Sequence, residues 1–148
     1  MMAKLDFKLD LDAPREKLIE KITNYQKLSE FLPDQLKNIE ILEQDENKTI
    51  TKETIFFSTV INKPFVQESV HKKISSNKIQ TEIVSGPAKG TLIIMVLNEK
   101  GDGTNISIDI ELKLSLKAII LQPLIKKWYK RILTSTLYKI NNSIMNNS

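Results

Sequence analysis

The sequence predicts an α+β fold in which a curved antiparallel sheet of seven strands wraps around one long C-terminal helix. Two observations lead to this class. Residues 36–116 consist of short β-type segments separated by turn residues. From about residue 121 to 144, apolar side chains recur at spacings of three and four, as in an amphipathic helix. The expected order is one strand, two helices, six strands and the long helix, in a single domain over residues 1–148.

The N-terminal part predicts a strand followed by two helices. Apolar and charged side chains alternate over residues 5–11, which is the pattern of a half-buried strand. A helix is expected from about 13 to 24, with Pro14 in its first turn. A shorter helical segment fits residues 25–32, and Pro33 ends it.

Six further strands follow, separated by Gly, Pro, Asn and Ser. We expect them to pair as sequential antiparallel hairpins in a strongly curved sheet. Gly101-Asp102-Gly103 predicts a tight hairpin in which the glycines supply positive φ angles. The predicted strands cover residues 39–41, 49–61, 65–74, 79–84, 90–97 and 104–116.

One strand differs from the others because residues 92–97 are six consecutive apolar residues. Such a strand is apolar on both faces. One face should look toward the long helix and any ligand, while the other packs beneath flanking side chains or forms an exposed patch. The helix, at about 24 residues, would be roughly 36 Å long and could cover the whole sheet.

The composition excludes several classes of function. The chain has no cysteine and one histidine, so we expect no disulfide, metal site or cofactor. It has no glycine-rich phosphate loop. No apolar run approaches the ~20 residues that span a bilayer, and the N-terminus lacks the apolar run of a signal peptide. We therefore expect a cytoplasmic protein.

The charge is distributed unevenly. All 18 acidic residues lie at or before Glu111, together with 15 of the 22 basic ones, and only basic residues follow. This surface is either a solvated helix face or a contact for phosphate groups, such as an anionic membrane touched transiently. No nucleic-acid signature accompanies it, although the helix could instead bind a protein or an RNA. The densest basic residues are Lys126, Lys127, Lys130 and Arg131.

Two ionisable residues on one strand are candidates for chemistry. His71 is either a general base or a surface residue near lysines. Glu68 lies between Val66 and Val70 on an apolar strand face. It either points into a cavity, where burial would raise its pKa, or is exposed or paired with Lys52.

Trp128 leaves a similar choice open. It is a packing anchor, a residue of the cavity mouth, or part of a membrane-surface patch with the basic residues around it.

Three stretches carry a resemblance to a known superfamily. They are LDAPREKL at residues 11–18, ITNYQKLSEFLP at residues 22–33, and GDGT at residues 101–104 before the last strand and helix. Together they resemble the START-like (helix-grip, SRPBCC) superfamily, especially its polyketide cyclase and coenzyme Q-binding branches.

The resemblance implies a long helix that closes a curved sheet over an apolar cavity, where most members bind lipids, isoprenoids or polycyclic aromatics. We therefore expect non-enzymatic binding, transport or sensing of a hydrophobic small molecule. The alternative is a cyclase- or aromatase-type enzyme acting in the same cavity, with Glu68 or His71 as acid or base. The expected ligand-binding residues are Phe31, Phe57, Val66, Glu68, Val70, Met95, Ile108, Ile110, Leu124, Trp128 and Ile132.

Overall fold

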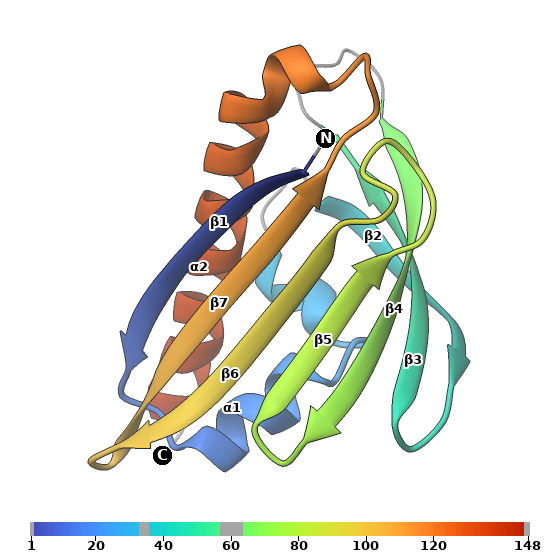
Figure 1. Ribbon diagram of the computed structural model, residues 1–148. Coiled ribbons are helices and arrows are strands. Elements are labelled where there is room, and N and C mark those ends of the chain that lie inside the picture. The colour runs from blue at the N-terminus through green and yellow to red at the C-terminus, as the bar shows by residue number, and fades with distance from the viewer. Residues whose placement is uncertain (1, 33–35, 57–63, 147–148) are drawn as a thin grey trace.

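The computed structural model describes residues 2–32, 36–56 and 64–146 (Figure 1). Within them lie one sheet of seven strands, two α-helices and two short 3-10 helices. The elements are β1 (Met2–Leu11), α1 (Arg15–Ile22), η1 (Leu28–Phe31), β2 (Leu36–Gln44), β3 (Lys48–Ile55), β4 (Phe65–Ser75), β5 (Lys78–Ile83), β6 (Leu92–Lys100), β7 (Gly103–Lys113), η2 (Ile119–Leu121) and α2 (Gln122–Asn146).

The sheet has the order β1-β7-β6-β5-β4-β3-β2, and all of its pairs are antiparallel. Strands β2 to β7 therefore follow one another as a meander, while β1 joins the far edge beside β7. The sheet curves around α2, and α1 lies across one end of it (Figure 1). The predicted fold class, a curved antiparallel sheet wrapped around a long C-terminal helix, is confirmed.

The two glycines of the β6–β7 hairpin have different roles. Gly101 has a φ of 60°, which favours glycine, so this part of the prediction is right. Gly103 has no positive φ, contrary to the prediction. A side chain at Gly103 would collide with the backbone carbonyl oxygen of Leu11, so glycine is required there by close approach.

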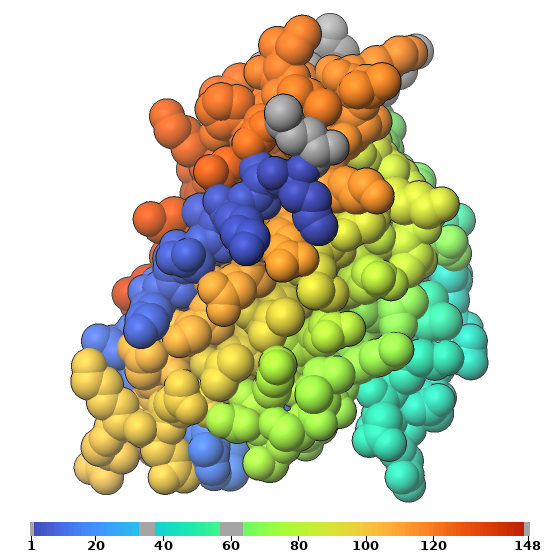
Figure 2. Space-filling view, viewed as in Figure 1, coloured from blue at the N-terminus to red at the C-terminus, as the bar shows by residue number. Residues whose placement is uncertain are grey.

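The apolar strand β6 contributes to the core through alternate residues. Ile93 and Leu97 are buried on the inner face. On the outer face, Leu92, Ile94 and Val96 are half-buried, and Ile94 lies in register between polar residues of β5 and β7. The outer face of β1, β7, β6 and β5 forms a continuous surface of side chains (Figure 2). The stems of polar neighbours therefore help to cover the second apolar face of β6.

The long helix α2 has 25 residues and Pro123 in its first turn, as predicted. Its buried side chains include Ile132, Leu137 and Ile140. Asn141 is also buried, and its Oδ1 accepts a hydrogen bond of 2.9 Å from the backbone nitrogen of Ala13. This bond ties the β1–α1 connection to α2. Among the described residues, no helix is both long and apolar enough to cross a bilayer.

Several predicted boundaries are wrong, including those of the strands expected over residues 39–41 and 90–97, which are Leu36–Gln44 and Leu92–Lys100. The helical segment expected over residues 25–32 is only the four-residue η1. The last strand ends at Lys113 rather than residue 116, because the chain leaves the sheet to reach α2. Leu116, predicted to lie in this strand, is instead 87% exposed.

Candidate functional site

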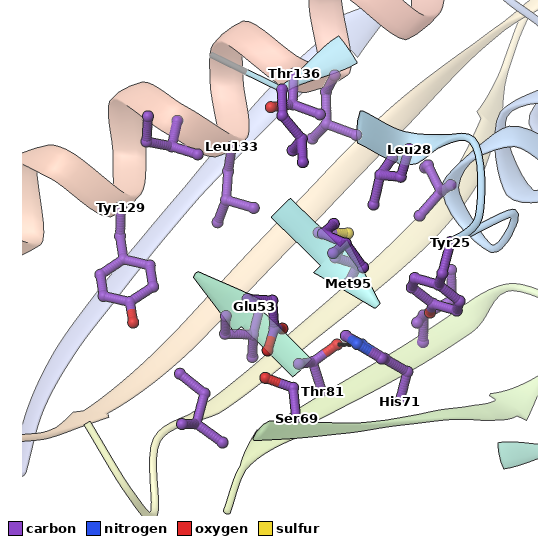
Figure 3. Close-up of a pocket in the computed structure, with 18 of the residues that line it drawn as sticks. Tyr25, Leu28, Glu53, Ser69, His71, Thr81, Met95, Tyr129, Leu133 and Thr136 are labelled. Carbon is purple, nitrogen blue, oxygen red and sulfur yellow. Dashed lines mark hydrogen bonds between the residues drawn. The ribbon is translucent and has the colours of Figure 1, made fainter. Parts of the chain in front are cut away.

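A cavity of about 160 Å³ lies between the inner face of the sheet and α2 (Figure 3). Most of its lining side chains are apolar, and the polar ones gather on β3, β4 and β5. The lining residues are Ile22, Tyr25, Leu28, Leu32, Ile39, Glu53, Ile55, Gln67, Ser69, His71, Ile79, Thr81, Ile83, Ile93, Met95, Trp128, Tyr129, Ile132, Leu133, Thr136, Leu137 and Ile140.

The polar side chains form a hydrogen-bonded chain across three neighbouring strands. Thr51 Oγ1 donates to Glu53 Oε1 over 3.2 Å, and it lies 2.8 Å from His71 Nε2. His71 Nδ1 lies 2.7 Å from Thr81 Oγ1. Because the single hydroxyl proton of Thr51 goes to Glu53, the histidine must donate from Nε2 and accept the Thr81 proton at Nδ1. The chain therefore holds His71 as one neutral tautomer.

His71 is covered by an aromatic ring. Tyr25 stacks on the imidazole with ring centroids 4.2 Å apart and planes at 22°. Burial lowers the pKa of His71 to about 4, because the cationic form would lose its hydration. The ring is therefore uncharged near neutral pH and acts as a hydrogen-bonding wall of the cavity.

Glu53 is the most perturbed acid in the cavity. Its side chain is only 7% exposed, and burial raises its pKa from 4.5 to about 7 despite hydrogen bonds from Ser69 and Thr51. Its second oxygen, Oε2, is buried without a hydrogen-bond partner, as is Oε1 of Gln67. These residues face each other in the β3–β4 register. The cavity wall therefore presents two adjacent acceptor oxygens with unused capacity.

The arrangement can hold a proton or a polar ligand group, but it offers no metal centre. Among the described residues, no three His, Asp or Glu side chains come together in a way that could bind a metal ion. A carboxyl whose pKa lies near 7 can exchange a proton at neutral pH. The polar wall also provides hydrogen bonds that could orient a ligand in an otherwise apolar space.

Three of the expected ligand-binding residues line this cavity: Met95, Trp128 and Ile132. Ile108 and Ile110 point to the same side of the sheet, but they are buried in the core and do not line the cavity. Their strand, β7, is packed tightly in this region.

Of the two alternatives for Glu68, the structure excludes the one that points it into this cavity, and Glu68 lies opposite Lys52 in the β3–β4 register. Val66 is 47% exposed and Glu68 is half-buried, and neither lines the cavity, nor does Val70. The inner face of β4 instead carries Gln67, Ser69 and His71. Because side chains alternate along a strand, an error in the inward face of β4 replaces every inward-facing residue with its neighbour in the sequence. The valines suggested an apolar interior, whereas the sheet is polar on its inner side at this point.

The remaining expected residues lie elsewhere. Phe31 is partly buried against the core and lies under the ammonium of Lys21, at 5.9 Å, but it does not line the cavity. Leu124 is 51% exposed. Phe57 lies outside the described residues. The interpretation of His71 as a surface residue is also wrong, because it is held inside the cavity by its hydrogen bonds.

Sequence reasoning missed Glu53, Thr51 and Gln67. The only available signal was that Thr49, Thr51 and Glu53 alternate with other residues along one strand face. A polar face normally indicates solvent exposure. Nothing in a single sequence distinguishes it from a polar face turned toward a cavity.

A second hollow, of about 320 Å³, lies beside the first amino acids of α2. Tyr129 lines both hollows. Its ring extends from α2 toward the sheet in Figure 3. The other lining residues are Phe65, Pro87, Ala88, Leu114, Ser115, Lys117, Ala118, Leu121 and Ile125.

Comparison with known proteins places this geometry in a known fold. No protein-family model matches the sequence, and no curated protein sequence matches it. Solved structures do match. The protein TTHA0849 from Thermus thermophilus has a TM-score of 0.83 at 14% identity, with 99% of each chain covered.

Two further structures match over nearly their whole length. A START superfamily protein from Mycobacterium smegmatis has a TM-score of 0.78 at 12% identity, covering 98% of this chain and 99% of that one. The Zhui aromatase/cyclase from Streptomyces has a TM-score of 0.74 at 10% identity, covering 96% and 95%. At these identities the likeness concerns the fold, and the chain therefore has the START-like, helix-grip fold that its motifs resemble.

Proposed function

We propose that this protein binds a hydrophobic small molecule without transforming it, as a carrier or sensor. The observation that carries the proposal is the cavity between the sheet and α2, which is lined mainly by apolar side chains and has one polar wall. A largely apolar pocket with a few convergent polar groups is the usual form of a small-molecule site. The START-like fold supports a site for a hydrophobic ligand, while the aromatase/cyclase among its structural neighbours bears on the second candidate function below. The absence of cysteine supports a cytoplasmic location.

The cavity volume favours a compact ligand. Drug-sized ligands occupy pockets of roughly 300 Å³ or more, and this cavity has about 160 Å³. An apolar cavity of about 150 Å³ is large enough for benzene. A ligand built on one ring or a short isoprenoid chain fits this volume. A longer lipid or a polycyclic aromatic would need Tyr129 to move, since its ring lines both hollows.

Binding is tested by two measurements on the purified full chain. Native mass spectrometry after gentle purification, followed by solvent extraction, should reveal a co-purifying hydrophobic compound. Calorimetric titration with toluene should give saturable binding in the protein stripped of that compound. Leu133→Trp, which fills the cavity from α2, should abolish toluene binding, whereas Leu124→Trp at an exposed site of the same helix should not. Absence of toluene binding to the stripped wild type would refute the proposal.

The exposed residues in the segment before α2 and at the start of α2 support loading from an anionic membrane. Leu116 and Ile120 are 87% and 86% exposed, and the exposed Leu124 follows at the same spacing of four. Of the basic residues on α2, Lys127, Lys130 and Arg131 are exposed and Lys126 is half-buried. Apolar side chains beside lysines suit the interface of a bilayer that contains acidic lipids.

Vesicle co-sedimentation tests this contact. Phosphatidylcholine vesicles that contain phosphatidylserine should bind the protein, and pure phosphatidylcholine vesicles should bind it weakly. Reversing the charges of Lys127 and Arg131 should weaken binding by about 1 kcal/mol for each residue. Reversal of Lys72 and Lys73, exposed on β4, is the matched control. Equal vesicle binding by the two double variants and the wild type would refute the proposed membrane contact.

The second candidate function is a cyclase- or aromatase-type enzyme, and the buried Glu53 favours it. A carboxyl with a pKa of about 7, next to the hydrogen-bonded Thr51 and His71, can act as a general acid or base. The extracted compound, incubated with wild-type protein and with Glu53→Gln, distinguishes the functions. Conversion by the wild type alone supports an enzyme. A compound that both proteins return unchanged supports a carrier.

A further inference from the structure

We propose that the ligand of this cavity carries a hydroxyl or amino group, and that this group donates a hydrogen bond to Oε2 of Glu53 or to Oε1 of Gln67, or to both where it is an amino group with two N–H bonds. This inference rests on the proposed binding function and names the chemistry of the ligand. The polar wall of β3 and β4 then recognises the polar group of the ligand, while the apolar walls contact its hydrocarbon part.

The hydrogen-bond donors of the polar wall are already in use. Thr51 donates to Glu53 Oε1, and the Ser69 hydroxyl lies close enough to the carboxyl to lower its pKa. With Thr51 committed in this way, His71 donates to Thr51 and accepts from Thr81. The hydroxyl and imidazole donors are thus satisfied inside the protein. What remains on this wall is acceptor capacity.

Two acceptor oxygens remain without partners, and both are deeply buried. Glu53 is 7% exposed and Gln67 is 5% exposed. Glu53 Oε2 and Gln67 Oε1 have no hydrogen-bond partner. The two residues are directly opposite each other in the β3–β4 register, and both line the cavity. A buried acceptor without a donor is unfavourable. A ligand that supplies the donor therefore gains the free energy of that hydrogen bond.

The wall that α2 forms across the cavity also carries a polar side chain. Thr136 projects from α2 toward the strands (Figure 3), and its Oγ1 is buried without a partner. A threonine hydroxyl both donates and accepts. Thr136 can therefore bond a second polar group of the ligand, across the cavity from the group that meets Glu53, while Ile79, Met95 and Leu133 line the space around the apolar part.

Three single-ring probes test the proposal by calorimetry at pH 8. They are 4-methylphenol, which has a donor, 4-methylanisole, in which a methyl group blocks it, and toluene, which has no polar group. The wild type should bind 4-methylphenol about tenfold more tightly than 4-methylanisole, the expected effect of one hydrogen bond to a buried acceptor.

Glu53→Leu should lower this ratio, because one of the two acceptors is lost while the volume is nearly kept. Gln67→Leu should reduce it in the same direction and serves if Glu53→Leu does not fold. Glu68→Leu, on the same strand as Gln67 but outside the cavity, should leave the ratio unchanged. The methyl group that makes 4-methylanisole larger than 4-methylphenol affects all variants alike, so its effect cancels when their ratios are compared.

The outcomes separate this inference from the proposed function. Binding of toluene with equal affinities for the two substituted probes would overturn the inference and leave the binding function standing. A ratio that survives both Glu53→Leu and Gln67→Leu would also overturn it. Failure of all three probes to bind the stripped wild type would overturn both.

Discussion

The two halves of the sheet are buried to the same extent but carry opposite chemistry on their inner faces. In the β6–β7 half, Leu97, Ile106 and Ile108 are fully buried. In the β3–β4 half, Thr51 and Ser69 are buried equally well, at 0% and 1% exposed. The first half is apolar and packed against α1 and α2, while the second is polar and faces the cavity.

The contrast between the two inner faces distinguishes residues that stabilise the fold from residues that form the candidate site. Apolar burial drives folding, so the β6–β7 half contributes most of the hydrophobic free energy. Buried polar groups are unfavourable unless they are hydrogen-bonded, and Glu53 and Gln67 each retain an unpartnered oxygen. The polar half is therefore better explained by ligand recognition than by stability. Each prediction below alters one half and leaves the other intact.

The largest expected effect is the loss of packing in the apolar half. Ile108→Ala should lower the free energy of unfolding by about 4 kcal/mol, because a fully buried side chain leaves a hole that its neighbours cannot fill. Urea unfolding measures this change. Ser107→Ala, on the other face of the same strand, is the control and should cost under about 1 kcal/mol. A similar cost for both would mean that the inner face of β7 is not a packed core.

The next effect concerns the pH dependence of the polar half. The pKa of Glu53 rises on folding from 4.5 to about 7, so the folded protein binds more protons than the unfolded chain over that range. Glu53 therefore destabilises the fold increasingly as the pH rises from 4.5 to 7. The Glu53→Gln variant lacks this loss of stability. Its free energy of unfolding should therefore rise by about 3 kcal/mol relative to that of the wild type between pH 4.5 and 7.

His71 acts in the opposite direction. Its pKa falls on folding from 6.5 to about 4, so its contribution to stability grows as the pH rises between these values. The wild type should show an almost flat profile, and Glu53→Gln should show a rising one. Another titratable group, Glu68, raises the pKa of Glu53, and Glu53 in turn raises the pKa of Tyr129 on α2, which burial also raises. Parallel profiles for the wild type and Glu53→Gln would contradict the raised pKa, and Glu82→Gln, exposed on β5, is the matched control.

A smaller effect is expected from the threonine that links the two ionisable groups. Thr51→Val keeps the shape of the side chain but removes the hydroxyl between Glu53 and His71. It should lower the free energy of unfolding by about 2 kcal/mol, since two buried groups lose a partner. Thr54→Val, on the outer side of β3, should change it little. Equal values for the two variants would show that the hydrogen-bonded chain contributes nothing to stability.

The smallest effect concerns the aromatic cover of His71. Tyr25→Leu should lower the free energy of unfolding by about 1 kcal/mol through loss of the stacked pair. It should also admit water to the imidazole and move the pKa of His71 up toward 6.5, which NMR titration can follow. Tyr25→Phe keeps the ring and should keep the low pKa. A pKa unchanged in Tyr25→Leu would show that the ring does not shield His71.

Local patterns predicted the elements well. The alternation over residues 5–11 and the spacing of apolar residues in α2 follow directly from backbone geometry, which fixes periods of 2.0 and 3.6. Boundaries were less certain, because Leu116 has the composition of a strand residue but lies where the chain turns toward α2. The site was predicted only in part: Met95, Trp128 and Ile132 line the cavity, whereas Val66 and Glu68 do not.

By itself, the sequence determined the order of the elements, the antiparallel hairpins and the helix that closes the sheet, because these depend on near neighbours along the chain. The tertiary structure alone decided which face of β3 and β4 turns inward, since alternation marks two faces without saying which one the helix covers. It therefore brought Glu53, Gln67 and His71 into the cavity and left Glu68 outside it. Their partners on neighbouring strands are 10 to 20 residues away, and the register of the strand pairs brings them together.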